Sequence, residues 1–512
     1  FPKTEEGSEN APHNLSNETG GSTVENTANC YMVGAPGWYC FPLVYGNAIS
    51  DKGDNTAAYS SSHMVNHLNK QIGAPYIIDN DGIDLSDVSV KLIWQDAEDL
   101  VEPDKIAYDP ALFGGKGGIK FQIGTIQEGN AVIALIDNKA KEDDYVVHAR
   151  EAPYDKLGNT KAVWSWHIWV TRFGFDFEKH IRILNHEEKA FDVMPVNLGW
   201  CSGNNPIRYY KRRKCEIKFK VGDREITRTI VQYPHFAVPR GDHPYYQWGR
   251  KDPFVGTNTI WGNKARWTHD GTPYGTGGEY NPPRLYNEPE VFSNNKNRKH
   301  AKDCLDVLVK NPDKWLNAPR EPKNPSDFTQ GFYSTNESYP DLWSIGDEKT
   351  VYDPCPPGYR VGPGDLFTGF TIPGKHTDPT LPRYWYDVIE SNMLSDYYDL
   401  ETVNSEVLEF YTDPRKVQSV IFPVTGYRDY DGKAEVVKYP GGTDKPEGFA
   451  WTGKAKDATN SYHLKFRRND PATEGDWNNR IVLPEASIIA PSGDYYNCNG
   501  FAVRPVVSSS TK

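Results

Sequence analysis

Two ten-residue segments, 245–254 (YYQWGRKDPF) and 352–361 (YDPCPPGYRV), constrain the fold of this chain more than any other feature of its sequence. Each combines aromatic rings with glycine, proline and charged residues. Proline and glycine fix unusual backbone angles, and the aromatic rings need a core to cover them. The two segments therefore indicate structural turns in a loop-rich domain rather than a reaction centre.

The size and composition of the chain indicate several β-rich domains. At 512 residues the chain is too long for one ordinary core, so we expect about two to four domains. Only 37% of the residues are hydrophobic, but 14 Trp, 31 Tyr and 21 Phe concentrate burial in large rings. The 44 Gly and 38 Pro require many connections, which favours β-rich or irregular architecture over helix bundles.

Charge and cysteine usage narrow the range of partners and of covalent links. The formal net charge of −12 argues against nucleic acid or an anionic membrane surface as the main partner. No stretch approaches the roughly 18 apolar residues of a membrane span, so no membrane-spanning segment is predicted. The seven cysteines do not make a disulfide framework, and their odd number leaves at least one thiol free unless it is shared between chains.

The first third of the chain is expected to form a flexible polar leader, residues 1–29, and a β-sandwich, residues 30–172. The leader is rich in Ser, Thr, Asn and Gly and shows no hydrophobic period. The sandwich region contains four strand candidates with alternating or continuous apolar residues: 88–94, 119–123, 131–136 and 163–170. Strands at such spacing, separated by turn residues, are typical of a β-sandwich.

The remainder, residues 173–512, mixes short strands with a helix and long loops. Residues 215–233 predict a hairpin that turns near Gly222 and Asp223. Apolar residues at helical spacing predict a helix over 301–308 that ends before Pro312. Further strand candidates are residues 417–424, 463–466, 481–483 and 501–507. This mixture indicates an α+β domain.

Seven short motifs occur in an order that resembles a known family, the Fibrobacter succinogenes major paralogous domain of Bacteroidales surface and fimbrial proteins. The resemblance runs from about residue 160 to 507. The upstream segments 29–49 and SVKLIWQD are similar to the β-domain that commonly precedes it. The motifs are WSWHIWV (164–170), NLG (197–199), the two segments 245–254 and 352–361, NP (311–312), GYR (426–428) and GFAVR (500–504).

This resemblance implies a C-type-lectin-like α+β domain over residues 173–512, behind the N-terminal all-β sandwich, with long insertions near 200–240 and 375–420. It also implies an extracellular protein at the cell surface or in a fimbrium, anchored to the outer membrane, without established catalytic activity. The framework residues of the lectin-like domain would be Tyr246, Trp248, Arg250, Asp252, Asp353, Cys355 and Arg360.

The chain departs from the family pattern at two places besides the insertions. It has AWTGKA (450–455) where relatives often carry YWSS, and Pro505 stands where they carry a cysteine. If that cysteine normally bridges to the position of Cys355, then Cys355 needs another partner here. Cys498 is the candidate for this disulfide, and an untethered terminus is the alternative.

Asp79, Asp81 and Asp84 are a candidate calcium site, because they place three carboxylates within six residues. An EF-type loop would need an acidic ligand near its twelfth position, where Val90 stands. The alternatives are therefore a calcium turn of another type and an ordinary hairpin turn rich in Asp, Asn and Gly. No other cofactor is expected.

Trp477 and Asn478 are a second candidate for calcium-dependent binding. With Asn479 they are close to the Trp-Asn-Asp motif of sugar-binding C-type lectins, which place Glu-Pro-Asn a short distance upstream. The nearest analogue of that partner motif, residues 287–289, is far away and reordered. The other interpretation is a loop tryptophan with polar neighbours.

The insertion at 378–412 is the better candidate for ligand binding. It holds five aromatic residues among acidic ones: Tyr384, Trp385, Tyr386, Tyr397 and Tyr398. Tyr and Trp stack on sugar faces and anchor protein interfaces at little entropic cost. The insertion forms either a binding surface or a lid packed on the lectin-like core.

These observations predict a non-enzymatic, adhesin-like protein of the cell surface, a fimbrial tip or accessory subunit. Loops of the lectin-like domain would bind a host glycan, a host protein or a bacterial ligand. The sandwich would connect to other pilin or surface subunits, for which strand donation is the usual means. The alternative is a surface glycan-binding lipoprotein that captures nutrients. A third function, an enzyme on the lectin-like fold, would require clustered cysteines or converging carboxylates.

Overall fold

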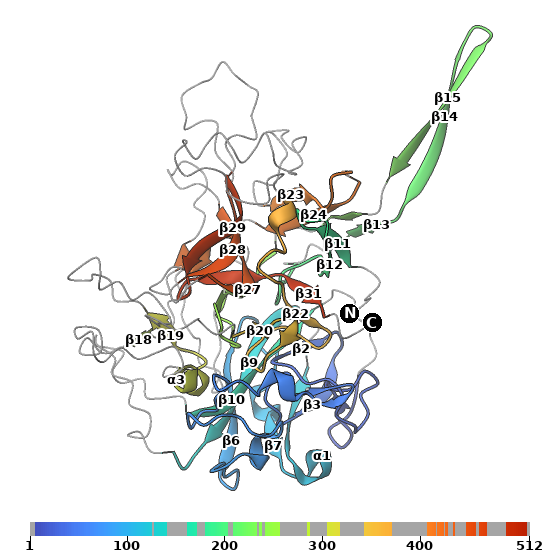
Figure 1. Ribbon diagram of the computed structural model, residues 1–512. Coiled ribbons are helices and arrows are strands. Elements are labelled where there is room, and N and C mark those ends of the chain that lie inside the picture. Colours follow the sequence, from blue (N-terminus) through green and yellow to red (C-terminus); the bar gives the residue numbers. More distant parts are fainter. Residues whose placement is uncertain are drawn as a thin grey trace, which may run out of the picture.

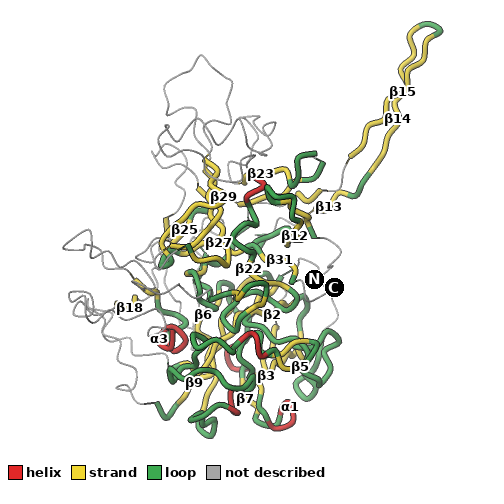
Figure 2. Tube along the Cα trace, in the orientation of Figure 1, coloured by secondary structure: helices red, strands yellow, loops and turns green. Residues whose placement is uncertain are grey.

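The computed structural model describes most of the N-terminal part of the chain and a framework of strands in the rest (Figures 1 and 2). The described residues are 6–124, 127–140, 161–171, 180–202, 208–232, 235–237, 241–256, 284–286, 305–317, 342–370, 407–415, 417–423, 425–428, 434–435, 447–456, 460–467 and 488–508. They consist mostly of strands with few helices, so the predicted β-rich class is confirmed.

Two four-stranded sheets form the N-terminal part. One has the order β1 (His13–Asn14), β3 (Gly37–Pro42), β8 (Gly118–Ile123) and β7 (Ala107–Asp109). The other has the order β2 (Cys30–Val33), β10 (Ala162–Val170), β9 (Gly129–Asp137) and β6 (Val88–Gln95). The Phe41 ring of β3 lies 5.0 Å from Trp166 of β10, so the sheets pack face to face as a sandwich. A short helix α1 (Leu112–Gly115) and the pair β4 (Ile49–Ser50) and β5 (Gly53–Asp54) lie between these strands in the sequence.

The leader is ordered, which corrects the prediction of flexibility over 1–29 for residues 6–29. β1 pairs in parallel with β3, and Asn14 is buried. Asn14 and Asn17 accept hydrogen bonds from the backbone amides of Ser16 and Thr19, at 3.0 and 2.9 Å. Asparagine side chains thus stabilise a turn in a segment with no hydrophobic period, and that local chemistry makes a polar sequence ordered.

A larger mixed sheet organises the C-terminal part (Figure 1). Its order is β26 (Ala434–Glu435), β25 (Tyr427–Arg428), β30 (Gly500–Val503), β27 (Glu447–Ala455), β28 (Asn460–Arg467) and β29 (Ile488–Tyr496), and β17 (Tyr246–Gln247) also pairs with β30. A second sheet has the order β11 (Ile181–Leu184), β12 (Ala190–Val193), β31 (Pro505–Val507) and β22 (Tyr359–Val361). The last strands of the chain therefore enter both sheets.

Several smaller elements surround these sheets. The predicted hairpin is confirmed as β14 (Arg213–Val221) and β15 (Arg224–Gln232), and the predicted helix as α3 (Leu305–Lys310). Four more strand pairs are β13 (Arg208–Tyr210) with β16 (His235–Ala237), β18 (Arg284–Tyr286) with β19 (Trp315–Asn317), β20 (Ser344–Ile345) with β21 (Glu348–Lys349), and β23 (Val407–Tyr411) with β24 (Ser419–Pro423). The candidate strand at 481–483 lies outside the described residues.

One contiguous hydrophobic core runs through both parts of the chain. It extends from Cys30 on β2 to Val506 on β31 and contains residues of the sandwich, of segments 245–254 and 352–361, and of the C-terminal sheets. The sandwich and the C-terminal part therefore pack as one body rather than as separate domains joined by a linker. In the part of the chain that the structure describes, no helix is long and apolar enough to cross a membrane.

Candidate functional site

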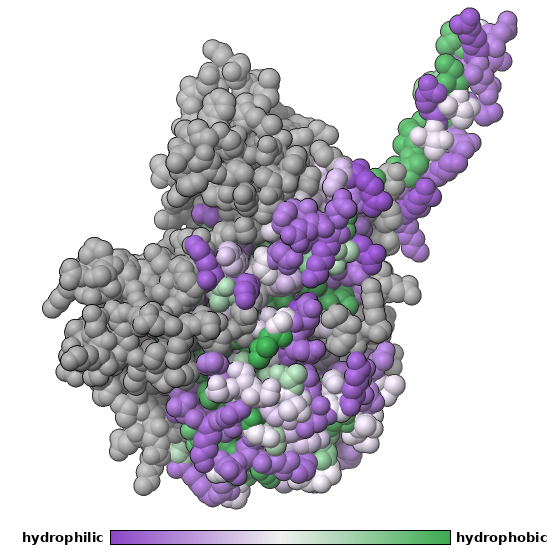
Figure 3. Space-filling model, in the orientation of Figure 1, coloured by the Kyte–Doolittle hydropathy of each residue, from purple (hydrophilic) through white to green (hydrophobic). Residues whose placement is uncertain are grey.

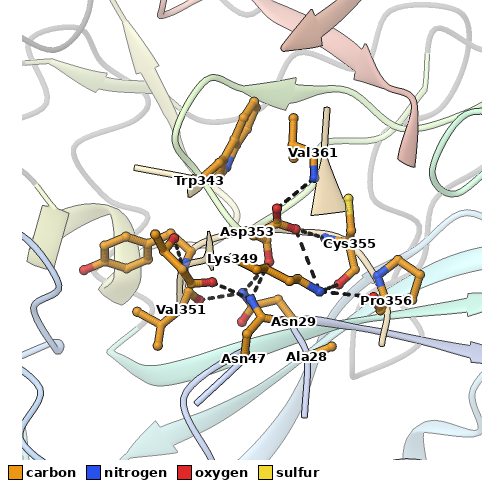
Figure 4. Close-up of polar contacts among 12 residues, drawn as sticks. Ala28, Asn29, Asn47, Trp343, Lys349, Val351, Asp353, Cys355, Pro356 and Val361 are labelled. Atoms are coloured by element: carbon orange, nitrogen blue, oxygen red, sulfur yellow. Dashed lines mark hydrogen bonds and ion pairs between the residues drawn. The ribbon is translucent and has the colours of Figure 1, made fainter. Parts of the chain in front are cut away.

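Segment 352–361 and the residues just before it lie against the sandwich (Figure 4). The side-chain amide of Asn29 donates hydrogen bonds to the carbonyl oxygens of Val351, at 2.7 Å, and Asp353, at 2.8 Å. The amide of Asn47 donates to the carbonyl oxygen of Thr350. Two asparagines from the sandwich thus satisfy three buried carbonyl groups of one loop. We call this contact between the sandwich and residues 342–361 and 245–256 the junction.

Tyr352 inserts its side chain into the sandwich at the junction. Its ring stacks on Trp164 of β10 with centroids 6.0 Å apart. Its hydroxyl donates to the carbonyl oxygen of Val65 and accepts a hydrogen bond of 3.0 Å from the amide of the same residue. The Trp164 indole in turn donates to Asn29 Oδ1 at 3.0 Å. Because every polar group in this set is paired, the aromatic contact is both dry and oriented.

Asp353 is a fully buried carboxylate that shapes the loop after it. Its two oxygens accept hydrogen bonds from the backbone amides of Cys355 and Val361, both at 2.8 Å. The ammonium group of Lys349 lies 3.9 Å from the carboxylate and donates to the carbonyl oxygens of Cys355, at 2.8 Å, and Pro356, at 3.1 Å. Burial raises the pKa of Asp353 and lowers that of Lys349, and each charge opposes the shift of the other.

The second segment joins the sandwich through a buried cluster of Ser165, Lys251 and Asp252. Lys251 Nζ lies 2.7 Å from Asp252 Oδ1 and donates to the hydroxyl of Ser165, which itself donates to Asp252 Oδ1 at 2.6 Å. The same ammonium group lies 4.6 Å from the ring centre of Trp164, in cation–π geometry. Burial lowers the pKa of Lys251 to about 8, although Asp252 favours the charged form.

Arg250 connects the same segment to the end of helix α3. Its guanidinium group donates to Gln247 Oε1 at 3.0 Å and to the carbonyl oxygens of Lys314, at 2.7 Å, and Asn311, at 3.0 Å. Its own carbonyl oxygen accepts a hydrogen bond of 3.0 Å from the Trp343 indole. Burial lowers the pKa of Arg250 to about 10. The helix end at 311–312 is therefore held by a residue some 60 positions earlier in the chain.

Tyr246 and Trp248 contact the sandwich and the C-terminal sheet from segment 245–254. The Tyr246 hydroxyl lies 3.1 Å from His167 Nδ1, and His167 Nε2 lies 2.9 Å from Asn130 Oδ1. Burial lowers the pKa of His167 to about 3, so the ring is neutral. The Trp248 indole donates to the carbonyl oxygen of Thr452 at 2.9 Å. One side of the segment thus contacts the sandwich and the other contacts the C-terminal sheet.

The charged framework residues of both segments are buried or paired in structural contacts. Asp353 is 0% exposed, and Arg250, Lys251 and Asp252 are each 3% exposed. Arg360 forms an ion pair of 3.0 Å with Asp347. Acid–base chemistry requires a group that a substrate can reach. This arrangement instead holds two parts of the protein together.

A small polar pocket of about 70 Å³ opens beside the junction. Its walls come from both parts of the chain and include Thr27, Asn47, Asp51, Lys349 and Ser508. Asn47 is 4% exposed, and its Oδ1 atom has no hydrogen-bond partner within the structure described.

The three carboxylates of the predicted calcium turn do not converge. Asp79 forms an ion pair with Lys116 at 2.6 Å, and Asp84 forms one with Lys139 at 2.6 Å. The lysine and Ser86 lower the pKa of Asp84 below its usual range. Across the residues that can be described, no three His, Cys, Asp or Glu side chains form a group that could hold a metal ion.

The predicted disulfide between Cys355 and Cys498 is wrong for this structure. Cys355 carries a free, buried thiol whose pKa is raised well above its usual value by burial. The Cys498 thiol contacts Asn499 Oδ1 at 3.8 Å instead. The backbone hydrogen bonds that Asp353 makes around Cys355 position that loop without a covalent link.

The predicted ligand-binding residues lie outside the described part of the chain. They are Tyr384, Trp385, Tyr386, Tyr397, Tyr398, Trp477 and Asn478, and their roles stay predictions.

The sequence reasoning missed the sandwich side of the junction. Asn29, Asn47 and Ser165 receive the two segments, and Lys349 stands just before one of them. A signal for the first two did exist, because they lie within the segment 29–49 that resembles the family's upstream β-domain. Their partners could not be read from it, because each lies about 300 or more residues away.

No protein-family model matches this chain, and no curated protein or solved structure matches it either.

Proposed function

We propose that this chain is a non-enzymatic, adhesin-like protein of the cell surface, a fimbrial tip or accessory subunit. Its C-terminal part would be a C-type-lectin-like domain that binds a host or bacterial ligand through its loops. The sandwich would connect that domain to other pilin or surface subunits.

The observation that carries this proposal is the junction. An adhesin must transmit the pull on its ligand to its point of attachment without separating the domains between them. Here one hydrophobic core and two sets of buried hydrogen bonds, from Asn29 and at Ser165, connect the sandwich to the C-terminal part. Buried hydrogen bonds with defined partners make such a contact specific in geometry. A rigid connection of this kind suits transmission of force better than catalysis by moving parts.

The binding residues proposed for this function are the aromatic residues of the insertion near 375–420, namely Tyr384, Trp385, Tyr386, Tyr397 and Tyr398. Their rings would stack on sugars or fill pockets of a partner protein. Trp477 and Asn478 would contribute from a second loop, with or without calcium.

A glycan array and a panel of purified host surface proteins test the proposal with the full chain. Binding should fall at least about tenfold when Tyr384, Trp385 and Tyr386 are replaced together by Ala. The matched control is Tyr108→Ala on β7 of the sandwich, which should bind as the unmodified chain does. Repeating the array with a chelator tests the calcium version separately. If the chain binds neither glycans nor host proteins, the adhesin proposal is wrong.

The second candidate, a surface glycan-binding lipoprotein for nutrient capture, is favoured by the polar pocket at the junction. The pocket is lined by polar residues such as Ser50, Asp51 and Asn55, which suit the hydroxyl groups of a small polyol. The two functions predict different cell fractions. An adhesive subunit should copurify with sheared fimbriae, whereas a capture protein should stay with the outer membrane after shearing.

A further inference from the structure

The hairpin of β14 and β15 projects from the body of the protein as a single arm (Figure 1). Its two nine-residue strands pair in continuous register, from Arg213 opposite Gln232 to Val221 opposite Arg224. Most of its side chains are exposed along the whole length. A two-stranded hairpin without a covering layer is marginally stable in water. Because this hairpin is long and stands apart from the body, we expect a partner surface to stabilise it.

The two faces of this arm differ in polarity. Alternation places Cys215, Ile217, Phe219 and Val221 of β14 on one face, together with the cross-strand neighbours Ile226 and Ile230 of β15. The exposed fractions are 53% for Phe219, 80% for Val221, 50% for Ile226 and 56% for Ile230. Figure 3 shows hydrophobic residues, in green, along the length of the arm beside hydrophilic ones in purple. Exposed apolar residues gathered on one face mark an interaction site.

The charge of the arm indicates what covers this face. Residues 211–232 contain eight Lys or Arg and three Asp or Glu, a net charge of +5. Since the whole chain carries −12, the remaining residues carry −17. Arg224 and Arg228 share the apolar face, opposite Val221 and Ile217. Two such arms would repel each other, whereas the acidic body of the same protein attracts one.

We propose that the hairpin is a docking arm that lies, apolar face inward, on the acidic body of a second copy of this chain. A reciprocal exchange about a twofold axis would cover both arms at once, and closed twofold dimers are the commonest homo-oligomers. Arg224 and Arg228 would meet carboxylates of the other copy, while Phe219 and Ile226 would supply the apolar contact. This dimer goes beyond the proposed adhesive function and does not depend on it.

Sedimentation equilibrium of the full chain at low and high salt tests the dimer. The unmodified chain should dimerise, and more weakly at high salt because the charges are screened. The variant Phe219→Ser with Ile226→Ser should weaken dimerisation at least about tenfold. The charge reversal Arg224→Glu with Arg228→Glu should do the same and remove most of the salt dependence. The control is Thr227→Ala with Thr229→Ala, on the opposite face of the arm, which should change little.

Two results would overturn the proposal. The first is a dimer whose strength is unchanged in the Phe219 and Ile226 variant. The second is a chain that stays monomeric at every concentration studied. In that case alkylation of Cys215, a free thiol on the apolar face, shows whether the chain's own residues cover the arm. Slow alkylation would mean an intramolecular cover, and fast alkylation would mean that another protein is needed; either would replace the second copy as the occupant.

Discussion

Asn29 donates a hydrogen bond of 2.8 Å to the carbonyl oxygen of Asp353, which follows it by 324 positions in the chain. The same amide group also satisfies the carbonyl oxygen of Val351, and its oxygen accepts from the Trp164 indole. One small polar side chain thus completes three buried hydrogen bonds, two of which join the sandwich to the C-terminal part. The stability of the whole body depends on contacts of this kind.

Replacement of Asn29 by Ala should lower the free energy of unfolding by about 3 kcal/mol. The Val351 carbonyl and the Trp164 indole would lose their partner in a buried environment, and the Asp353 carbonyl would keep only a 3.4 Å bond from Asn47. Urea unfolding followed by tryptophan fluorescence measures this loss. Asn138→Ala is the control. Asn138 is exposed, so water can replace its hydrogen bonds to Ser89 and Asp87 with little loss of stability. A loss for Asn29→Ala no larger than that of the control would contradict the account of the junction.

Replacement of Gly46 by Ala should disturb the same contact by steric overlap. Gly46 has a φ of +38°, and a Cβ atom there would lie 2.3 Å from the carbonyl oxygen of Val351. Gly53→Ala is the comparison: Gly53 has a φ of +97°, and nothing lies within 4 Å of its Cβ position. This variant therefore introduces backbone strain without steric overlap. We expect a loss of about 1 kcal/mol for Gly53→Ala and clearly more for Gly46→Ala. Equal losses in thermal or urea unfolding would show that the close approach to Val351 is unimportant.

Replacement of Lys251 by Met should cost about 3–5 kcal/mol, because it leaves the Asp252 carboxylate buried without its cation. The double variant Lys251→Met with Asp252→Asn removes the stranded charge and should be more stable than the single one. Urea unfolding of the four members of this cycle gives the coupling energy. If the two substitutions prove additive, Lys251 and Asp252 do not act as a pair.

The unfolding free energy should fall as the pH decreases from about 6.5 to 4. Burial, together with the charge of the nearby Lys310, lowers the pKa of His67 to about 4. The unfolded chain therefore takes up a proton in this range that the folded chain cannot, which favours unfolding by up to about 1.4 kcal/mol per pH unit. His67→Phe should flatten the profile relative to the unmodified chain. His13→Phe, at a half-buried position, is the control; equal profiles for all three would contradict this effect.

Local patterns of the sequence predicted much of the scaffold. Alternation of apolar residues located β6 and β8, and the Gly222–Asp223 turn located the projecting hairpin. The polar segment before residue 30 was misjudged, because asparagine side chains order it where hydrophobicity does not. The predicted Cys355–Cys498 disulfide is wrong: it supplied Cys498 as a substitute for the family cysteine that Pro505 replaces, and the two thiols are not joined in the structure.

By itself the sequence determined that segments 245–254 and 352–361 are structural and that the chain is rich in strands. These properties depend on turn residues and alternation within about ten residues, so they can be read locally. Only the tertiary structure decided that Asn29 meets Asp353, that Ser165 meets Lys251, and that the arm stands apart with its apolar face exposed. Such pairings arise when distant segments share one core, because burial leaves each polar group only those partners that the packing brings within reach.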